Sequence, residues 1–210
     1  MKRQIEGVAE QILKCAETEF LQKGFMDASL RDIAKNCNVS TSSIYTRFGD
    51  KAGLFEAVVA PTINELYSYF VEGQEEFHRQ TDANTQVRNM FLYSGDKVNW
   101  FIGYIYDHFT TFQLLTIKSE GTKYSTFISD FVDMDVKYTV QFIDGIGSDV
   151  ISSGRITPEL LHILSSALYA GIFETVIHGM PREDAYIHVK KLRRFFVSGW
   201  KDIFDDEGEA

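Results

Sequence analysis

The sequence of 210 residues has only two cysteines and none of the common catalytic motifs. Cys15 and Cys37 form no CxxC pair and no zinc-binding pattern, so we expect buried thiols in a reducing compartment. The five histidines are scattered, and no HExxH pair, P-loop or GxSxG motif occurs. The segment GIGSDV at 145–150 lacks the third glycine of a dinucleotide-binding turn. These absences argue against an enzyme, a cofactor and a bound metal ion.

Long uncharged runs are missing as well. The longest stretch without a charged side chain lies between Glu159 and Glu174, which is too short to span a bilayer. Glu6, Glu10 and Glu17 interrupt the opening segment, which does not fit a secretion signal. We therefore expect a cytoplasmic protein that does not act in a membrane.

What the sequence does contain is apolar side chains and an uneven distribution of charge. Hydrophobic residues make up 44% of the chain and aromatic residues 14%, so a large core is expected. The net charge is −9. Residues 1–60 hold equal numbers of basic and acidic side chains, so the excess of acid lies in residues 61–210. This asymmetry predicts two parts with different partners, of which the first is compatible with phosphate groups.

The first sixty residues show a succession of helices. Apolar residues recur at helical spacing from Ile5 to Phe20, and Gly24 is expected to end that helix. Ser29 and Ser40 are good N-caps for short helices over 30–37 and 41–48. A longer helix is expected to begin at Lys51 and to end at a proline, residue 61.

These short helices have the features of a helix-turn-helix motif. Ala34 is small enough for two helices to approach closely, and Asn38 tolerates the positive φ that the turn requires. Ile44 and Phe48 lie four residues apart and point one face of the second short helix inward. Short hydroxyl side chains and a tyrosine are left outside, where they can contact phosphates and base edges in the major groove. The alternative for this hydroxyl-rich segment is a solvated capping turn.

Residues 12–58, ILKCAETEFLQKGFMDASLRDIAKNCNVSTSSIYTRFGDKAGLFEAV, resemble the DNA-binding domain of TetR-family transcriptional regulators. The shared positions include the glycine–aromatic pair at 24 and 25, the SLRDIA segment at 29–34 and the IYxxF segment at 44–48. Asn38 stands where the family usually has glycine. Gly53 departs from good helix formers and is expected to weaken the helix that begins at Lys51.

The resemblance implies roles for individual residues. It places Thr41, Ser42, Ser43, Tyr45 and Thr46 on a recognition helix. Tyr45 and Lys51 would contact phosphate, Lys51 at a helix N-terminus that already favours anions. Arg47 could contact phosphate or pack against the protein. The predicted DNA-binding residues are therefore Ser29, Arg31, Thr41, Ser42, Ser43, Tyr45, Thr46 and Lys51.

The second half shows helical patterns at 62–80, 84–93, 96–120, 125–153, 157–179 and 182–204. By resemblance, residues 61–210 form a helical domain that binds a ligand and pairs two subunits, after a helix-turn-helix domain over 1–60. Two apolar stripes fit such pairing or an intramolecular core: Leu160, Leu164, Ala167, Leu168, Gly171, Ile172 and Thr175, and Leu192, Phe195, Phe196, Gly199, Trp200 and Ile203.

Aromatic side chains are concentrated between residues 100 and 142, where they could line a pocket or fill a core. The tyrosines and tryptophan among them have polar atoms that need partners, which favours a pocket. The predicted effector is apolar or aromatic, and the acidic second half is compatible with a cation. The candidate ligand-binding residues are Trp100, Tyr104, His108, Phe112, Tyr138 and Phe142.

The sequence thus predicts an all-α protein with an N-terminal helix-turn-helix domain and a C-terminal helical domain. By resemblance it would be a homodimer that binds a palindromic operator in double-stranded DNA. A small molecule would release the operator, with repression as the family default and activation as the alternative. A regulator-like fold that acts through a protein partner is a further alternative.

Overall fold

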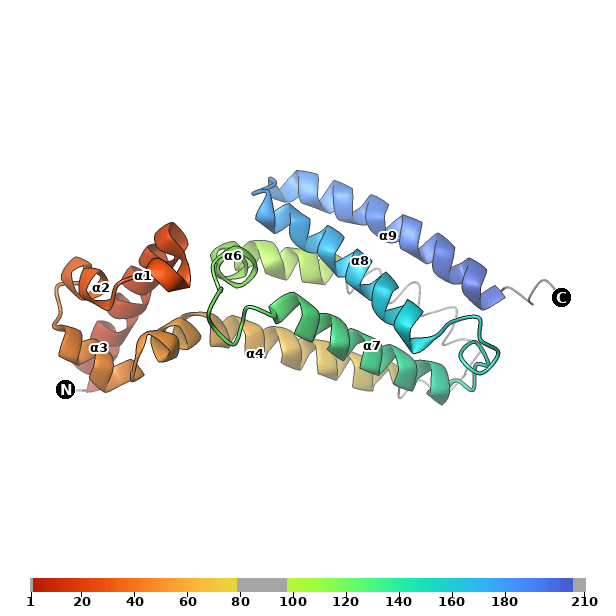
Figure 1. Cartoon of the computed structure of the whole chain (residues 1–210), viewed down its shortest axis with the longest axis horizontal. Helices are drawn as coiled ribbons and strands as arrows, with labels where there is room; N and C mark the ends of the chain where they lie inside the picture. Colours follow the sequence, from red (N-terminus) through yellow and green to blue (C-terminus); the bar gives the residue numbers. More distant parts are fainter. Residues whose placement is uncertain (1, 79–97, 206–210) are drawn as a thin grey trace. The chain divides into compact units, whose positions relative to one another are not determined.

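A computed structural model describes residues 2–78 and 98–205 of the chain, and the regular elements within these ranges are all helical (Figure 1). The predicted all-α fold is confirmed. By compactness the chain divides into two units. Unit 1 comprises Met1–Ser68 and His108–Thr126, and unit 2 comprises Tyr69–Asp107 and Phe127–Ala210. The predicted boundary between two domains, 1–60 and 61–210, stays a prediction.

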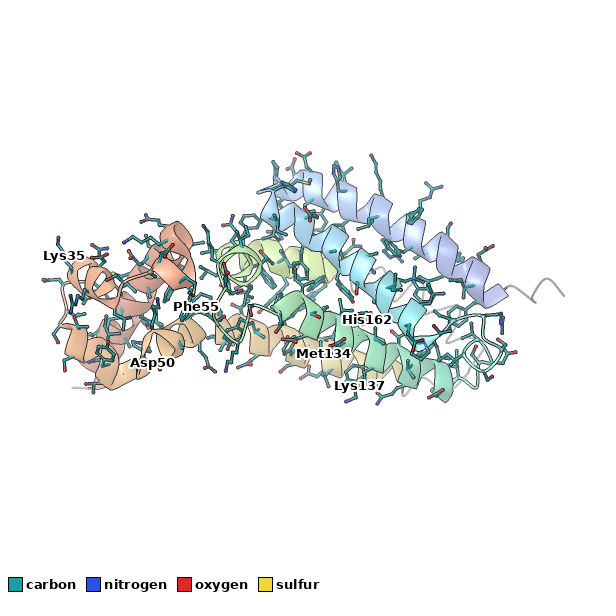
Figure 2. The ribbon with its side chains drawn as sticks, viewed as in Figure 1. Lys35, Asp50, Phe55, Met134, Lys137 and His162 are labelled. Atoms are coloured by element: carbon teal, nitrogen blue, oxygen red, sulfur yellow. The ribbon has the colours of Figure 1, made fainter. Side chains whose placement is uncertain are left out.

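Unit 1 contains α1 (Lys2–Asp27), α2 (Leu30–Asn36), α3 (Thr41–Phe48), the first part of α4 (Lys51–His78) and α6 (Phe109–Ile117). Helix α2 packs against α3, and α1 packs against both α2 and α6. The core of this unit includes three aromatic rings, Phe20, Phe25 and Phe55, whose centroids lie 5.0 to 6.1 Å apart. Figure 2 labels Phe55 on α4.

The break predicted at Gly24 is present, because this residue has φ 74° and ψ 170° within α1. The end predicted for the next long helix is not. Helix α4 continues through Pro61 to His78, although proline removes one hydrogen-bond donor. The apolar face continues across the proline, with Leu54 and Val59 buried before it and Ile63 buried after it. Pro61 itself is exposed, so water can satisfy the backbone oxygen that it leaves without a donor.

Unit 2 contains α7 (Phe127–Gly145), α8 (Pro158–Ile177) and α9 (Arg182–Asp205), together with residues 98–107, which are helical. Helix α8 packs against both α7 and α9 (Figure 1). Near the start of α9, the Tyr106 hydroxyl donates to the Met180 carbonyl at 2.8 Å, and Arg182 pairs with Asp107 at 2.6 Å. These contacts fix α9 against residues 98–107.

The other helical patterns agree with the structure to different degrees. The pattern at 157–179 corresponds to α8, whose N-cap is Thr157. The pattern at 96–120 is divided at His108, which has φ −119° and ψ 34°. The pattern at 125–153 ends earlier, at Gly145, and turns follow it. The pattern at 84–93 lies outside the described residues.

Candidate nucleic-acid interface

The start of α2 is held by a buried carboxylate. Ser29 is its N-cap, and its hydroxyl oxygen accepts a hydrogen bond from the Asp32 backbone N–H at 3.4 Å. The Ser29 N–H in turn donates to Glu19, which is 3% exposed. Lys23 pairs with Glu19 at 2.8 Å and with Asp32 at 2.9 Å. This network joins α1 to α2 and fixes the start of α2, which carries the exposed Arg31.

The turn between α2 and α3 has the geometry that the sequence predicts. Asn38 has φ 52°, and within the described residues no other non-glycine residue has a positive φ. The Val39 N–H donates to the Ala34 carbonyl at 2.9 Å, and Ala34 is 3% exposed. The predicted tight turn is therefore confirmed, and the burial of Ala34 is consistent with a close approach of the two helices there.

Helix α3 is capped at both ends and anchored by one buried side chain. The Ser40 hydroxyl oxygen accepts from the Ser43 N–H at 3.1 Å, and Gly49 closes the other end with φ 78°. Ile44 is fully buried. Because α3 has only eight residues, these caps and this anchor do much to keep it helical.

The outer face of α3 carries small and hydrogen-bonding side chains. Ser42, Tyr45, Thr46 and Arg47 are exposed, and Tyr45 keeps 52% of its surface accessible. Thr41 and Ser43 are half-buried, so the predicted set of five does not lie equally far out. The side chains at 42, 43 and 46 are small, which suits insertion of a helix into the major groove.

Two side chains on this face already make bonds within the helix. The Thr46 hydroxyl donates to the Ser42 carbonyl at 2.8 Å, so its oxygen is left to accept from a base or water. Arg47 donates to the hydroxyl oxygen and the carbonyl of Ser43, at 2.6 and 3.1 Å. Arg47 thus packs along α3 in the absence of DNA, which is one of its two predicted roles.

Lys51 is engaged inside the protein. Its ammonium group donates to the carbonyls of Met26 and Ala28 at 2.9 and 3.1 Å and lies 4.7 Å from the centre of the Phe25 ring. These carbonyls belong to the end of α1 and the segment that follows it. Lys51 therefore ties the start of α4 to that end, and contact with phosphate stays a prediction for it.

Position 53 is occupied by glycine for a steric reason that the sequence did not reveal. A Cβ atom at this position would lie 2.1 Å from the Phe48 carbonyl oxygen. The Gly53 N–H also donates to the Asp50 carboxylate at 2.7 Å, which caps α4. Figure 2 labels Asp50 before α4 and Lys35 on α2. Glycine at position 53 thus allows α4 to begin immediately after α3.

We expect Lys51→Ala to lower the free energy of unfolding by about 1–3 kcal/mol, because two hydrogen bonds from a charged donor are lost. If Lys51 also contacts phosphate, a plot of the logarithm of the DNA-binding constant against the logarithm of the salt concentration becomes shallower. Its slope changes by about one for each DNA-binding domain. Urea denaturation and a salt titration of DNA binding measure the two effects. Lys35→Ala, at an exposed position on α2, is the control. Unchanged stability of Lys51→Ala would contradict the role that the structure assigns to it.

Residues that follow α6 complete unit 1. The Lys118 carbonyl accepts from the Phe25 N–H at 2.9 Å, and Lys123 pairs with Glu56 at 2.6 Å. The Tyr124 ring lies 6.2 Å from the Phe55 ring. The segment 118–124 therefore supports both the end of α1 and the start of α4, on which α3 depends. Sequence reasoning assigned this segment to the second domain, because it is distant in the chain.

The structure places the six candidate ligand-binding residues in different surroundings. Trp100 stacks between Tyr69 and Tyr104 in unit 2, with Tyr104 only 7% exposed. Tyr138, also in unit 2, packs against Phe70 with ring centroids 5.9 Å apart. Their role in binding a ligand stays a prediction.

The other three lie elsewhere. Phe142 belongs to a core cluster with Ile143 and Leu161 in unit 2. His108 precedes α6 and Phe112 is fully buried, both in unit 1. Sequence reasoning missed a polar group of unit 2: Asp135 on α7 accepts hydrogen bonds from Ser165 and Tyr169 on α8. Asp130, Asp133 and Lys137 lie on the same helix, so the sequence did not single out Asp135.

Within the described ranges, no group of three or more histidine, cysteine or acidic side chains could hold a metal ion. Cys37 is 1% exposed, and burial, together with its neighbour Cys15, raises the pKa of its thiol to about 11. A thiol with so high a pKa is a poor nucleophile.

Comparison with known proteins agrees with this geometry. The sequence model described as "Bacterial regulatory proteins, tetR family" matches residues 12–58, which run from α1 to the start of α4. The biofilm operon icaADBC HTH-type negative transcriptional regulator IcaR of Staphylococcus aureus is 29% identical over 84 residues, 40% of this chain and 45% of IcaR. The HTH-type transcriptional regulator UidR of Escherichia coli is 28% identical over 78 residues, 37% of this chain and 40% of UidR. The matched segment thus spans less than half of the length of these curated relatives.

Solved structures resemble the chain over most of its length. NalD, the secondary repressor of the MexAB-OprM multidrug efflux pump in Pseudomonas aeruginosa, matches with a TM-score of 0.61 and 21% identity, over 91% of this chain and 96% of NalD. A TetR-family transcriptional regulator from Agrobacterium tumefaciens matches with a TM-score of 0.56 and 17% identity, over 92% and 97%. At such identities the likeness establishes the fold. Residues 12–58 thus match the tetR-family helix-turn-helix segment, and the chain as a whole has the fold of these solved regulators.

Proposed function

We propose that the protein is a homodimeric repressor that binds a near-palindromic operator and releases it when a small molecule occupies unit 2. The observation that carries this proposal is the outer face of α3. Its exposed side chains are hydroxyls, a tyrosine and an arginine on a helix fixed by caps and by Ile44. IcaR is named as a negative regulator and NalD as a repressor, which supports repression here.

Pairing of two chains is supported by an apolar surface on α8 and α9. Helix α8 is long and apolar enough, by length and composition, to cross a membrane, yet only 33% of its apolar window is buried inside the chain. Within the chain it packs against both α7 and α9. A second copy of the chain would cover the remaining surface, which includes Leu160, Ile163 and Ile177 on α8 and Ile187 and Phe195 on α9.

The two apolar stripes seen in the sequence are divided between the core and this surface. Ile172 and Thr175 are buried within the chain. A Cβ atom at Gly171 would lie 2.7 Å from a Leu192 methyl group, so the close helix approach at Gly171 is between α8 and α9 of one chain. Substitution of Gly171 would disturb this packing as well as a dimer. Phe195, which is 74% exposed, is the better site for a test.

We expect Phe195→Asp to sediment as a monomer of 24.0 kDa at micromolar concentration, where the wild type sediments at twice that mass. Operator affinity would fall, because a single helix-turn-helix domain contacts too few phosphates and only one half-site. Ile117→Asp is the control, since Ile117 is 43% exposed and lies in unit 1. A wild type that is monomeric, or a Phe195→Asp variant that remains dimeric, would contradict the proposed interface.

The proposed response to a ligand follows from linkage. A ligand releases the operator only if it binds the conformation that cannot contact both half-sites more tightly than the competent one. Helix α4 belongs to unit 1 through Ser68 and to unit 2 from Tyr69, so it connects the two physically. We propose that the effector is an apolar or aromatic molecule and that the protein acts in the cytoplasm, where the operator is.

Selection from a random duplex library, followed by a reporter assay, tests the proposal. The wild type should enrich a near-palindromic sequence, and that sequence placed upstream of a reporter should reduce transcription when the protein is expressed. Increased transcription would contradict repression and indicate an activator. Enrichment of no sequence would contradict the function as a whole.

A further inference from the structure

Unit 2 contains a carboxylate that faces two hydroxyl groups between α7 and α8. Asp135 accepts hydrogen bonds from the Ser165 hydroxyl and from the Tyr169 hydroxyl, each at 3.0 Å. Ser165 is 5% exposed and Tyr169 is 8% exposed. Burial and the Asp135 charge raise the pKa of Tyr169 well above its ordinary value, so this hydroxyl stays protonated and donates.

Asp135 is deep in the unit and yet not sealed. Burial raises the pKa of its carboxyl to about 6, which leaves most of it ionised at neutral pH. The residue as a whole nevertheless keeps an intermediate accessible surface. Asp135 is therefore desolvated, while part of the residue stays accessible to solvent.

The negative charge of Asp135 has no cationic partner within the described residues. Both of its hydrogen-bond donors are neutral. The nearby His162 pairs instead with Asp133 at 3.3 Å, and Lys137 is exposed. Figure 2 labels His162 on α8 and, on α7, Met134 and Lys137, which bracket Asp135 in the sequence. A buried ionised carboxylate without a cation is costly, so it is usually retained for a role other than stability.

Aromatic rings flank the carboxylate on α7. Phe131 is one turn before Asp135, and Tyr138 is one turn after it. The Phe131 ring lies 4.9 Å from the Tyr169 ring, and Phe70 contacts Phe131 and Tyr138 at 5.3 and 5.9 Å between centroids. Tyr138 and Phe70 are half-buried, so each presents part of its ring. A carboxylate beside accessible aromatic rings matches the chemistry of an organic cation.

We propose that Asp135, with the rings of Tyr138 and Phe70, binds an aromatic or alkylated organic cation in unit 2. The cation would supply the positive charge that Asp135 lacks, and the rings would contact its apolar groups. This inference rests on the proposed function, in which unit 2 binds the effector, and it adds the charge of the ligand and the residue that recognises it. It also includes one of the predicted ligand-binding residues, Tyr138.

Calorimetry with two probe cations, benzyltrimethylammonium and tetraphenylphosphonium, tests the proposal. The size-matched anion tetraphenylborate controls for apolar binding without a positive charge. We expect the wild type to bind at least one cation, and Asp135→Asn to bind it at least about tenfold more weakly. Asp133→Asn is the control variant, because Asp133 lies on the same helix with its side chain 66% exposed. Circular dichroism checks that both variants fold.

Two results would overturn the proposal: neither cation binds the wild type, or both bind Asp135→Asn as well as they bind the wild type. Tighter binding of tetraphenylborate than of tetraphenylphosphonium would overturn it too. Operator release is measured separately, by fluorescence anisotropy of labelled duplex in the presence of the bound cation. Binding through Asp135 without release would leave the site standing and contradict the ligand response in the proposed function.

Discussion

Replacing Ser42 by Leu is expected to reduce operator affinity at least about 100-fold without destabilising the protein. Ser42 is exposed in the first turn of α3, where a leucine would extend toward the DNA. The larger side chain would hold the helix away from the base edges and remove the contacts of Thr46 and Tyr45 as well. Leucine is a better helix former than serine, so α3 itself should be slightly more stable.

A matched control separates this effect from a change in folding. Thr18 on α1 is exposed, and its hydroxyl donates to the carbonyl four residues earlier at 3.0 Å, as that of Thr46 does on α3. Thr18→Leu and Thr46→Leu therefore lose the same local bond on different helices. We expect only the α3 variants to lose operator binding in anisotropy titrations. Wild-type affinity of Ser42→Leu and Thr46→Leu would show that α3 is only a capped surface helix.

Asp135→Asn is expected to raise the free energy of unfolding by about 1–3 kcal/mol at pH 8. The pKa of this carboxyl is about 6 in the folded protein, against about 3.9 in an unfolded chain. Between these values the folded state binds the proton more tightly. The contribution of Asp135 to stability therefore falls as the pH rises from about 4 to about 6, and it stays low above that range.

Asparagine removes this ionisation and can still bond to both hydroxyls, because Ser165 and Tyr169 can each donate or accept. Urea denaturation of the wild type and of Asp135→Asn, at the same protein concentration and at both pH 4.5 and pH 8, measures the difference in the free energy of unfolding. We expect the difference between the two free energies of unfolding to be smaller at pH 4.5 than at pH 8, with Asp135→Asn the more stable protein at pH 8. Equal pH dependence of the two proteins would show that the carboxyl is not desolvated.

Much of unit 1 could be predicted because each step has a local cause. Serine caps, an asparagine at positive φ and a small residue at the crossing are visible in the sequence and are present at Ser29, Ser40, Asn38 and Ala34. Local signals also explain the error at Pro61, since a proline usually ends a helix. Continuation depended on tertiary packing of the apolar residues on either side of it, which no local pattern reports.

The candidate sites were predictable to different extents for the same reason. The outer face of α3 follows from helical periodicity once Ile44 is placed inside. The bonds of Lys51 to Met26 and Ala28 join residues more than twenty positions apart, so the sequence could not show them. Asp135 and Tyr169 likewise meet only because α7 packs on α8. The aromatic residues between 100 and 142 were numerous enough to suggest a pocket, but their distribution over two units was not visible.

We propose that this protein binds double-stranded DNA in a sequence-specific way through α3. The most direct test of this claim is the affinity of the wild type for its selected duplex and for a random duplex of equal length at one physiological salt concentration. We expect a ratio of at least about 10³ between the two affinities. We also expect Ser42→Leu to bring this ratio close to one, while Thr18→Leu leaves it unchanged. A wild type that binds both duplexes equally would contradict the claim.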